Sequence, residues 1–181
     1  METIVSQLPN REIFFRGNHD IETGCPWFTY GAIIAIEYLV KPTDKVLELG
    51  CGGSTIFWSR RCAEVKSYDL DLNWVRKVRN SLPLPSNVQF IWAERAKKLI
   101  QLVQKEPDGY YNWLICDIGN CYSFRRRILQ ASVSKLHEKG FLVIDNYAKR
   151  YISLFDYSKW GKVYTFDEIN YSGKGTRICR R

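Results

Sequence analysis

KVLELGCGGS, residues 45–54, is the stretch of sequence that decides the fold. Val46, Leu47 and Leu49 are typical of a buried parallel strand, because both faces of such a strand are covered by other elements. The glycines that follow have no Cβ atoms, so the backbone can turn sharply and a ligand can approach it closely. A buried strand that ends in a glycine-rich turn is typical of a nucleotide-binding α/β domain.

The residues around the glycines argue against two common kinds of nucleotide site. A phosphate-binding P-loop needs a Lys-Ser or Lys-Thr pair after its last glycine, whereas Gly53 is followed by Ser54 and Thr55. The dinucleotide pattern G-x-G-x-x-G needs a glycine where this chain has Thr55. Glu48 lies at the turn, where its charge would repel a pyrophosphate and favour a ligand with a cationic end.

Acidic and small residues follow the next two predicted strands. Asp69 comes directly after the second strand, residues 64–68, and an acid at this point accepts hydrogen bonds from ribose hydroxyls in nucleoside-binding folds. The third strand, residues 88–92, brings Ala93 and Glu94 to the same edge of the sheet. We expect an adenine ring to lie there, against small or apolar groups.

Five segments, in the same order along the chain, resemble the motifs of class I S-adenosylmethionine-dependent methyltransferases: VLELGCGGST, SYDLD, WAER, NWLICDIG and GFLVIDNY. The resemblance runs from Trp27 to the C-terminus. It implies a Rossmann-like, doubly wound α/β fold with a mostly parallel sheet, a C-terminal antiparallel hairpin and three α/β/α layers. It also implies S-adenosylmethionine as cofactor. The cofactor-binding residues that it implies are Glu48, Gly50, Cys51, Gly52, Ser54, Thr55, Asp69, Leu70, Ala93, Glu94 and Asp117.

Helical and strand patterns alternate along the chain, as a doubly wound sheet requires. The predicted helices are 32–39, 54–61, 72–80, 96–104 and 124–136, the last ending at Lys139-Gly140. The remaining predicted strands are 112–116, 141–144, 162–166 and 176–179, and the last two flank a glycine-bearing hairpin turn. The 181 residues are enough for one large core but not two, so we expect a single domain over residues 1–181, with residues 1–25 as an N-terminal cap segment.

Composition favours a cytoplasmic protein, or one of the host cytoplasm if the source is viral. No apolar run reaches the roughly 18 residues that a membrane span needs, and the N-terminal residues do not read as a secretion signal. The 6 cysteines form no C-x-x-C pair and no zinc-type spacing, which favours reduced thiols.

Polar residues end the fourth and fifth predicted strands and suggest a metal site. Asp117 follows the fourth strand, and Asp145 and Asn146 follow the fifth, so all three should reach one rim of the sheet. Two carboxylates and an amide oxygen are ligands that Mg²⁺ or Mn²⁺ prefers. The arrangement resembles metal-dependent O-methyltransferases of the catechol O-methyltransferase type, which implies an ion that holds the acceptor hydroxyl and lowers its pKa. The alternative is that both aspartates cap strand ends through loop amides.

The general base is left open by Asn120, because the catechol O-methyltransferase type has a lysine at that position. Asp117, Asp145 and His19 are the candidates. His19 lies in a polar loop of the N-terminal segment, which often covers the acceptor site in this fold. The alternative is that His19 is a solvated loop residue. The aromatic stretch 26–30 either lines the mouth of a pocket or packs in the core, and packing is the commoner use.

The nature of the acceptor is the last open question. Lysine and arginine exceed the acids by 8, and Arg125-Arg126-Arg127 is one cluster that would suit nucleic-acid phosphates, a phosphorylated sugar or a solvated face. The proline-proline-aromatic motif of nucleic-acid amino methyltransferases is missing after the fourth strand. The resemblance to compact bacterial and viral enzymes of glycan biosynthesis favours a sugar hydroxyl. The alternatives are an RNA or DNA methyltransferase and a non-catalytic cofactor-binding module.

Overall fold

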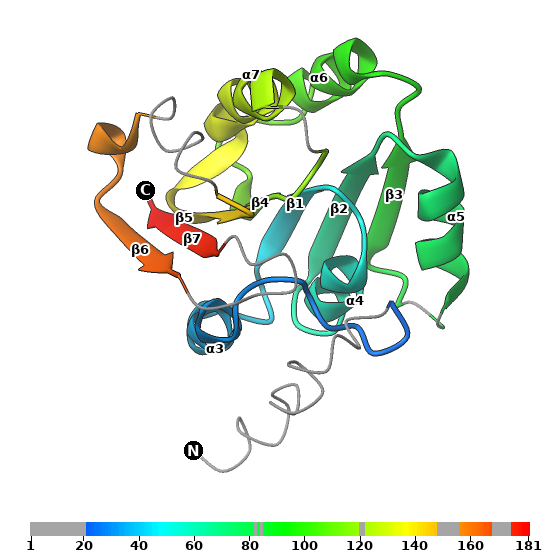
Figure 1. Cartoon of the computed structure of the whole chain (residues 1–181), viewed down its shortest axis with the longest axis horizontal. Coiled ribbons are helices and arrows are strands. Elements are labelled where there is room, and N and C mark those ends of the chain that lie inside the picture. The colour runs from blue at the N-terminus through cyan, green and yellow to red at the C-terminus, as the bar shows by residue number, and fades with distance from the viewer. Residues whose placement is uncertain (1–20, 82, 84, 120–121, 148–155, 168–174) are drawn as a thin grey trace.

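A seven-stranded sheet forms the centre of the computed structural model, which describes residues 21–81, 83, 85–119, 122–147, 156–167 and 175–181 (Figure 1). The strand order is β3-β2-β1-β4-β5-β7-β6. Strands β1 to β5 run parallel, and β7 is antiparallel to both of its neighbours. The strands are β1 (Lys45–Leu49), β2 (Glu64–Asp69), β3 (Val88–Trp92), β4 (Tyr111–Cys116), β5 (Leu136–Asp145), β6 (Lys162–Phe166) and β7 (Thr176–Arg180).

Helices cover both faces of this sheet and give the three predicted layers. Helices α6 (Ala96–Gln104) and α7 (Tyr122–Ser132) lie on one face, and α3 (Tyr30–Leu39), α4 (Gly53–Ser59) and α5 (Leu72–Ser81) lie on the other (Figure 1). For α4 to α7, which connect parallel strands, this division follows from the right-handedness of β-α-β crossovers. The chain moves across the sheet in one direction from β1 to β3 and in the other from β3 to β5, so the connecting helices change face after β3. The predicted doubly wound fold with a C-terminal antiparallel pair of strands is therefore confirmed.

The first strand is buried on both faces, as its apolar sequence predicted. Leu47 and Leu49 pack in the core cluster that contains Leu99 of α6 and Ile128 of α7. Val46, which points the other way, packs with residues of α3 and α4. The alternation of side chains along a strand thus divides the core into two layers.

The C-terminal end of α7 differs from the prediction of a helix over 124–136. Helix α7 ends at Ser132, a short 3-10 turn covers Val133–Lys135, and β5 begins at Leu136, so Lys139-Gly140 lies inside a strand. Leu136 pairs with Tyr111 of β4, and the register shifts before the next pair. This pairing across the sheet overrides the local helical pattern.

The C-terminal strands pair as the sequence predicted, with Phe166 of β6 opposite Thr176 of β7. Most of the predicted turn between them lies outside the described residues, as does His19. The 5 cysteines in the described part, 25, 51, 62, 116 and 179, are buried free thiols. Within the same part of the chain, no helix is both long and apolar enough to cross a membrane.

Candidate functional site

The turn after β1 requires glycine at its first position. Gly50 has φ +101°, and a Cβ atom there would lie 2.8 Å from the carbonyl carbon and oxygen of Asp117. The Gly50 N–H donates to the carbonyl of Tyr68 (2.8 Å), and the Asp117 N–H donates to the carbonyl of Leu49 (2.9 Å). The ends of β1, β2 and β4 are therefore held together with no room for a side chain.

A cavity of about 340 Å³ opens at the carboxyl ends of these strands. The residues that line it include the turn residues 50–54, Asp69, residues 117–119 and Asn146. The side chains of Trp27 and Trp74 also line it. A second, more open hollow of about 560 Å³ shares Asp69, Ile118 and Gly119 with it and adds Leu70 and Trp92. The two hollows form one depression at the edge where ligands bind in open α/β sheets.

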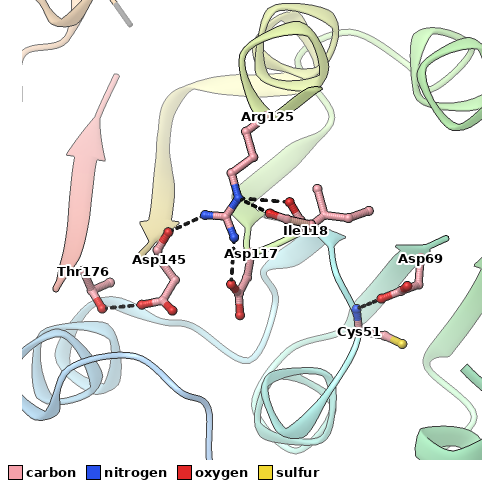
Figure 2. A network of polar contacts seen from close by, with 8 residues as sticks. Cys51, Asp69, Asp117, Ile118, Arg125, Asp145 and Thr176 are labelled. Carbon is pink, nitrogen blue, oxygen red and sulfur yellow. Dashed lines mark hydrogen bonds and ion pairs between the residues drawn. The ribbon is translucent and has the colours of Figure 1, made fainter. Parts of the chain in front are cut away.

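Asp69 has a fixed orientation in this depression. One carboxylate oxygen, Oδ2, accepts a hydrogen bond from the Cys51 N–H (2.9 Å), as Figure 2 shows. The other, Oδ1, accepts one from the Asp71 N–H (2.9 Å). The indole N–H of Trp74 donates to the carbonyl of Cys51 (2.7 Å). The turn is thus held from β2 and from α5, and it holds the Asp69 carboxylate in place.

Glu48 does not face the cavity, contrary to the expectation that it would meet a cationic ligand. The side chain is fully buried and accepts hydrogen bonds from the hydroxyls of Ser54, Thr55 and Ser67. Desolvation raises the pKa of Glu48 to about 7, although the three hydroxyls oppose this shift. Glu48 and the equally buried Thr55 therefore support the turn from beneath, and neither lines either hollow.

Asp117 and Asp145 come together as predicted, but a guanidinium lies with them (Figure 2). Nη2 of Arg125 is 3.2 Å from Oδ1 of Asp117, and Nη1 donates to the carbonyl oxygen of Asp145 (2.6 Å). The Asp145 carboxylate accepts from the Thr176 hydroxyl (2.7 Å). Desolvation raises the pKa of Asp117, and Arg125 and Asn146 oppose the rise. Desolvation and then the charge of Asp117 raise the pKa of Asp145 well above its usual value.

The predicted metal ligands do not fit a divalent ion. Asp117 is already ion-paired with a buried guanidinium, so an ion bound to Asp117 would lie beside a fixed positive charge. Asp145 has no exposed surface, which also argues against its predicted role as base. Within the described residues, no group of three or more His, Cys, Asp or Glu side chains could hold a metal.

The remaining predicted residues divide into three groups. Gly50, Cys51, Gly52, Ser54, Asp69, Asp117 and Asn146 line the main cavity, and Leu70 lines the neighbouring hollow. Ala93 is buried, and Glu94 is exposed beside Arg95 without lining either hollow. His19 lies outside the described residues, as does Asn120.

Sequence reasoning did not identify Trp74, Ile118 and Arg125 as residues of the site. Trp74 and Arg125 both lie near the start of a helix that follows a strand, at the edge where ligands bind, and this position was the available signal. Arg125 was instead grouped with its two neighbours in a basic cluster. Only Arg125 of the three is buried, with 3% of its surface exposed.

Comparisons with solved structures support the fold. A methyltransferase from Geobacter sulfurreducens is 18% identical, with a TM-score of 0.59 and coverage of 99% of this chain and 89% of that chain. A Streptococcus mutans protein, provisionally named a methyltransferase and solved with SAH, is 15% identical, with a TM-score of 0.61 and coverage of 82% and 96%. A tRNA methyltransferase, TrmI, from Aquifex aeolicus is 16% identical, with a TM-score of 0.64 and coverage of 82% and 66%.

These identities are low, so the similarity establishes the Rossmann-like methyltransferase fold and leaves the reaction to be argued from the site. No family model matches the sequence, and no curated protein matches it significantly.

Proposed function

We propose that this protein is an S-adenosylmethionine-dependent methyltransferase that transfers a methyl group to a hydroxyl of a small acceptor, with a glycan sugar as the preferred class. One observation carries the proposal: the glycine turn after β1 and the fixed Asp69 carboxylate face the same cavity. A nucleoside ligand needs both features. The glycine turn lets the ligand approach the protein backbone closely, and the carboxylate accepts hydrogen bonds from the ribose hydroxyls.

The two hollows suit the two ends of the cofactor. Leu70 and Trp92 provide an apolar and aromatic surface for adenine beyond Asp69. The turn residues 50–54 line the main cavity, where the methionine part would lie. One structural neighbour, the Streptococcus mutans protein, was solved with SAH, which is the product of such a reaction.

The acceptor would enter the main cavity near Trp27 and Asn146. Trp27 is 38% exposed, and its ring offers a stacking surface for the apolar face of a sugar. Among the residues that the structure describes, Asp117 is the carboxylate that lines this side of the cavity. Its raised pKa suits a group that takes the proton from the acceptor hydroxyl. The protein would otherwise act by aligning the acceptor oxygen, the methyl carbon and the sulfur. The proposed reaction involves no divalent ion, since Arg125 already neutralises Asp117.

Calorimetry with SAH and radiolabelled methyl transfer test this proposal. We expect SAH to bind and a labelled methyl group to appear on a sugar within a panel of glycans, phenols and RNA. Tight binding of SAH without transfer to any member of the panel would favour a non-catalytic cofactor-binding module. No binding of SAH or S-adenosylmethionine would contradict the methyltransferase proposal itself.

A nucleic-acid acceptor is the second candidate, and the charge of α6 and α7 favours it. Neither helix contains an acidic residue, and Lys97, Lys98, Arg126 and Arg127 are exposed on them. Both helices begin at the edge of the sheet that holds the cavity, because each follows a parallel strand. Labelled transfer to RNA that weakens steeply with added salt would favour this candidate over a sugar.

Other basic residues near the C-terminus are engaged within the fold. The Arg177 guanidinium lies over the rings of Tyr147 (4.4 Å) and Tyr157 (4.8 Å), and Arg181 donates to the carbonyl of Leu136 (2.6 Å). A part of the positive charge therefore stabilises the C-terminal strands. This reduces the basic surface that would be left for phosphates and keeps the sugar as our first choice.

A further inference from the structure

We propose that Arg125 is a built-in cation that takes the place of a divalent ion and holds the ends of β4 and β5 in the ligand-binding arrangement. Arg125 is thus a positioning residue, and its effect on the cofactor rests on the proposed methyltransferase function. Its effect on the structure of the site does not depend on that function.

The guanidinium joins three parts of the cavity wall. Nε donates to the carbonyls of Ile118 (3.0 Å) and Gly119 (2.7 Å), in the loop that follows β4. Nη1 donates to the carbonyl of Asp145 at the end of β5, and Nη2 pairs with the Asp117 carboxylate (Figure 2). Three backbone carbonyls and one carboxylate from two strand ends therefore converge on one side chain.

The charge of Arg125 suits the place that it occupies. Asp117 and Asp145 lie at neighbouring strand ends, and a partly buried carboxylate such as that of Asp117 is stabilised by a cation beside it. The guanidinium supplies that cation from α7. With 3% exposure it is isolated from water, and a buried charge of this kind is tolerated only when it is paired and hydrogen-bonded.

The shape of the group matters as much as its charge. A guanidinium is planar and directs its N–H groups outward in a fixed fork, so it can donate in several directions at once. A lysine ammonium has all three of its donors on one nitrogen, so it does not reproduce the spread of the Nε, Nη1 and Nη2 donors. A divalent ion could bind both the carboxylates and the carbonyl oxygens, but all its ligands would have to lie about 2.0–2.6 Å from one centre. The guanidinium instead reaches its acceptors from three separate nitrogens, at distances of 2.6–3.2 Å.

This arrangement links the two sides of the cavity. Ile118 and Gly119 line both hollows on the cofactor side, and Asn146, directly after Asp145, lines the main cavity on the acceptor side. Asn146 has φ +53° and hydrogen-bonds to Asp117, so its position depends on the same strand ends. Loss of Arg125 should therefore disturb the loop and Asn146 together.

The test compares Arg125→Ala with Arg126→Ala, which removes the exposed neighbour on the same helix. Thermal melting is measured for both variants with and without low-millimolar methylguanidinium chloride, and SAH binding is measured by calorimetry with and without EDTA. We expect Arg125→Ala to bind SAH about 10-fold or more weakly, because it loses hydrogen bonds to charged and buried groups. Methylguanidinium should restore binding and raise the melting temperature of Arg125→Ala while leaving Arg126→Ala unchanged.

Wild-type SAH binding should be insensitive to EDTA. Arg125→Lys serves as the second variant if Arg125→Ala does not fold, and it should keep the charge but not restore wild-type affinity. Wild-type affinity in Arg125→Ala or Arg125→Lys, or loss of wild-type binding in EDTA, would overturn the inference. If wild type binds no SAH, the proposed function fails, and methylguanidinium rescue of the melting temperature still decides the role of Arg125.

Discussion

The Cys51 N–H donates a hydrogen bond to the Asp69 carboxylate across 2.9 Å, and this bond ties the glycine turn after β1 to the end of β2 (Figure 2). The carboxylate is therefore oriented before any ligand arrives. Because binding does not have to pay for ordering this group, the site is preorganised for a ligand with vicinal hydroxyls.

Replacing Asp69 by alanine should weaken SAH binding by about 10- to 100-fold, because hydrogen bonds to a charged group are lost and the Cys51 N–H is left without its acceptor. Asp69→Asn keeps one acceptor oxygen, so its affinity for SAH should fall by less. Calorimetric titration with SAH measures both. Asp108→Asn is the control, since Asp108 pairs with Lys135 away from the cavity. Equal affinity of Asp69→Ala and wild type for SAH would show that Asp69 does not bind the ligand.

Two adjacent glycines of the turn should respond differently to alanine. A Cβ atom on Gly53 would lie 2.3 Å from the carbonyl oxygen of Cys25, whereas a Cβ atom on Gly52 has its nearest neighbour at 4.0 Å, on Trp74. Gly53→Ala should lower the free energy of unfolding by about 1–3 kcal/mol through overpacking. Gly52→Ala should change it by less than about 1 kcal/mol but weaken SAH binding, because Gly52 lines the cavity.

Urea unfolding of the two alanine variants measures this difference in stability. Equal stability of the two variants would show that Cys25 does not pack closely on Gly53 at the start of α4.

Glu48 should make stability fall as pH rises. Its folded pKa, about 7, lies above the ordinary glutamate pKa of 4.5, so between these values the folded state holds a proton that the unfolded chain has released. The stability of wild type relative to Glu48→Gln should therefore be highest below pH 4.5 and decline until about pH 7. The full difference is of the order of 3 kcal/mol, from the pKa shift.

Chemical denaturation of both proteins at a series of pH values measures the effect of Glu48. The Gln variant cannot ionise at this position, so it serves as the reference for all other titrating groups. A pH-independent difference between the two proteins would show that the Glu48 carboxyl titrates normally.

Two consecutive tyrosines provide a matched test of a buried polar cluster behind the site. The Tyr111 hydroxyl donates to the buried Glu106 carboxylate, which also pairs with Lys66 (2.8 Å), whereas the Tyr110 hydroxyl donates to Glu64 at the surface (2.8 Å). Tyr111→Phe should lower the free energy of unfolding by about 1.5–3 kcal/mol, because a hydrogen bond to a buried charged group is lost. Tyr110→Phe should cost less than about 1 kcal/mol.

Thermal or urea unfolding distinguishes the two phenylalanine variants, and neither change should alter SAH binding directly. Equal losses of stability at both positions would mean that Glu106 is not the acceptor that matters for Tyr111.

The sequence by itself determined the order of strands and helices, the glycine turn and the place of Asp69. These features are local: a buried parallel strand reads as an apolar run, and a turn with φ +101° and a backbone 2.8 Å away can only be made by glycine. The rule that ligands bind at the carboxyl ends of parallel strands then placed Asp117 and Asn146 at the cavity without knowledge of any contact.

Only the tertiary structure decided which way the polar side chains point. Glu48 sits in an apolar strand, and its burial under three hydroxyls depends on Ser67, which is 19 residues away in β2. Arg125 reads as one of three equivalent arginines, and its position on α7 directs it alone into the strand ends. The start of β5 at Leu136 likewise depends on pairing with Tyr111. The physical reason is the same in each case: burial and pairing are set by partners distant in the chain, and local patterns carry no information about them.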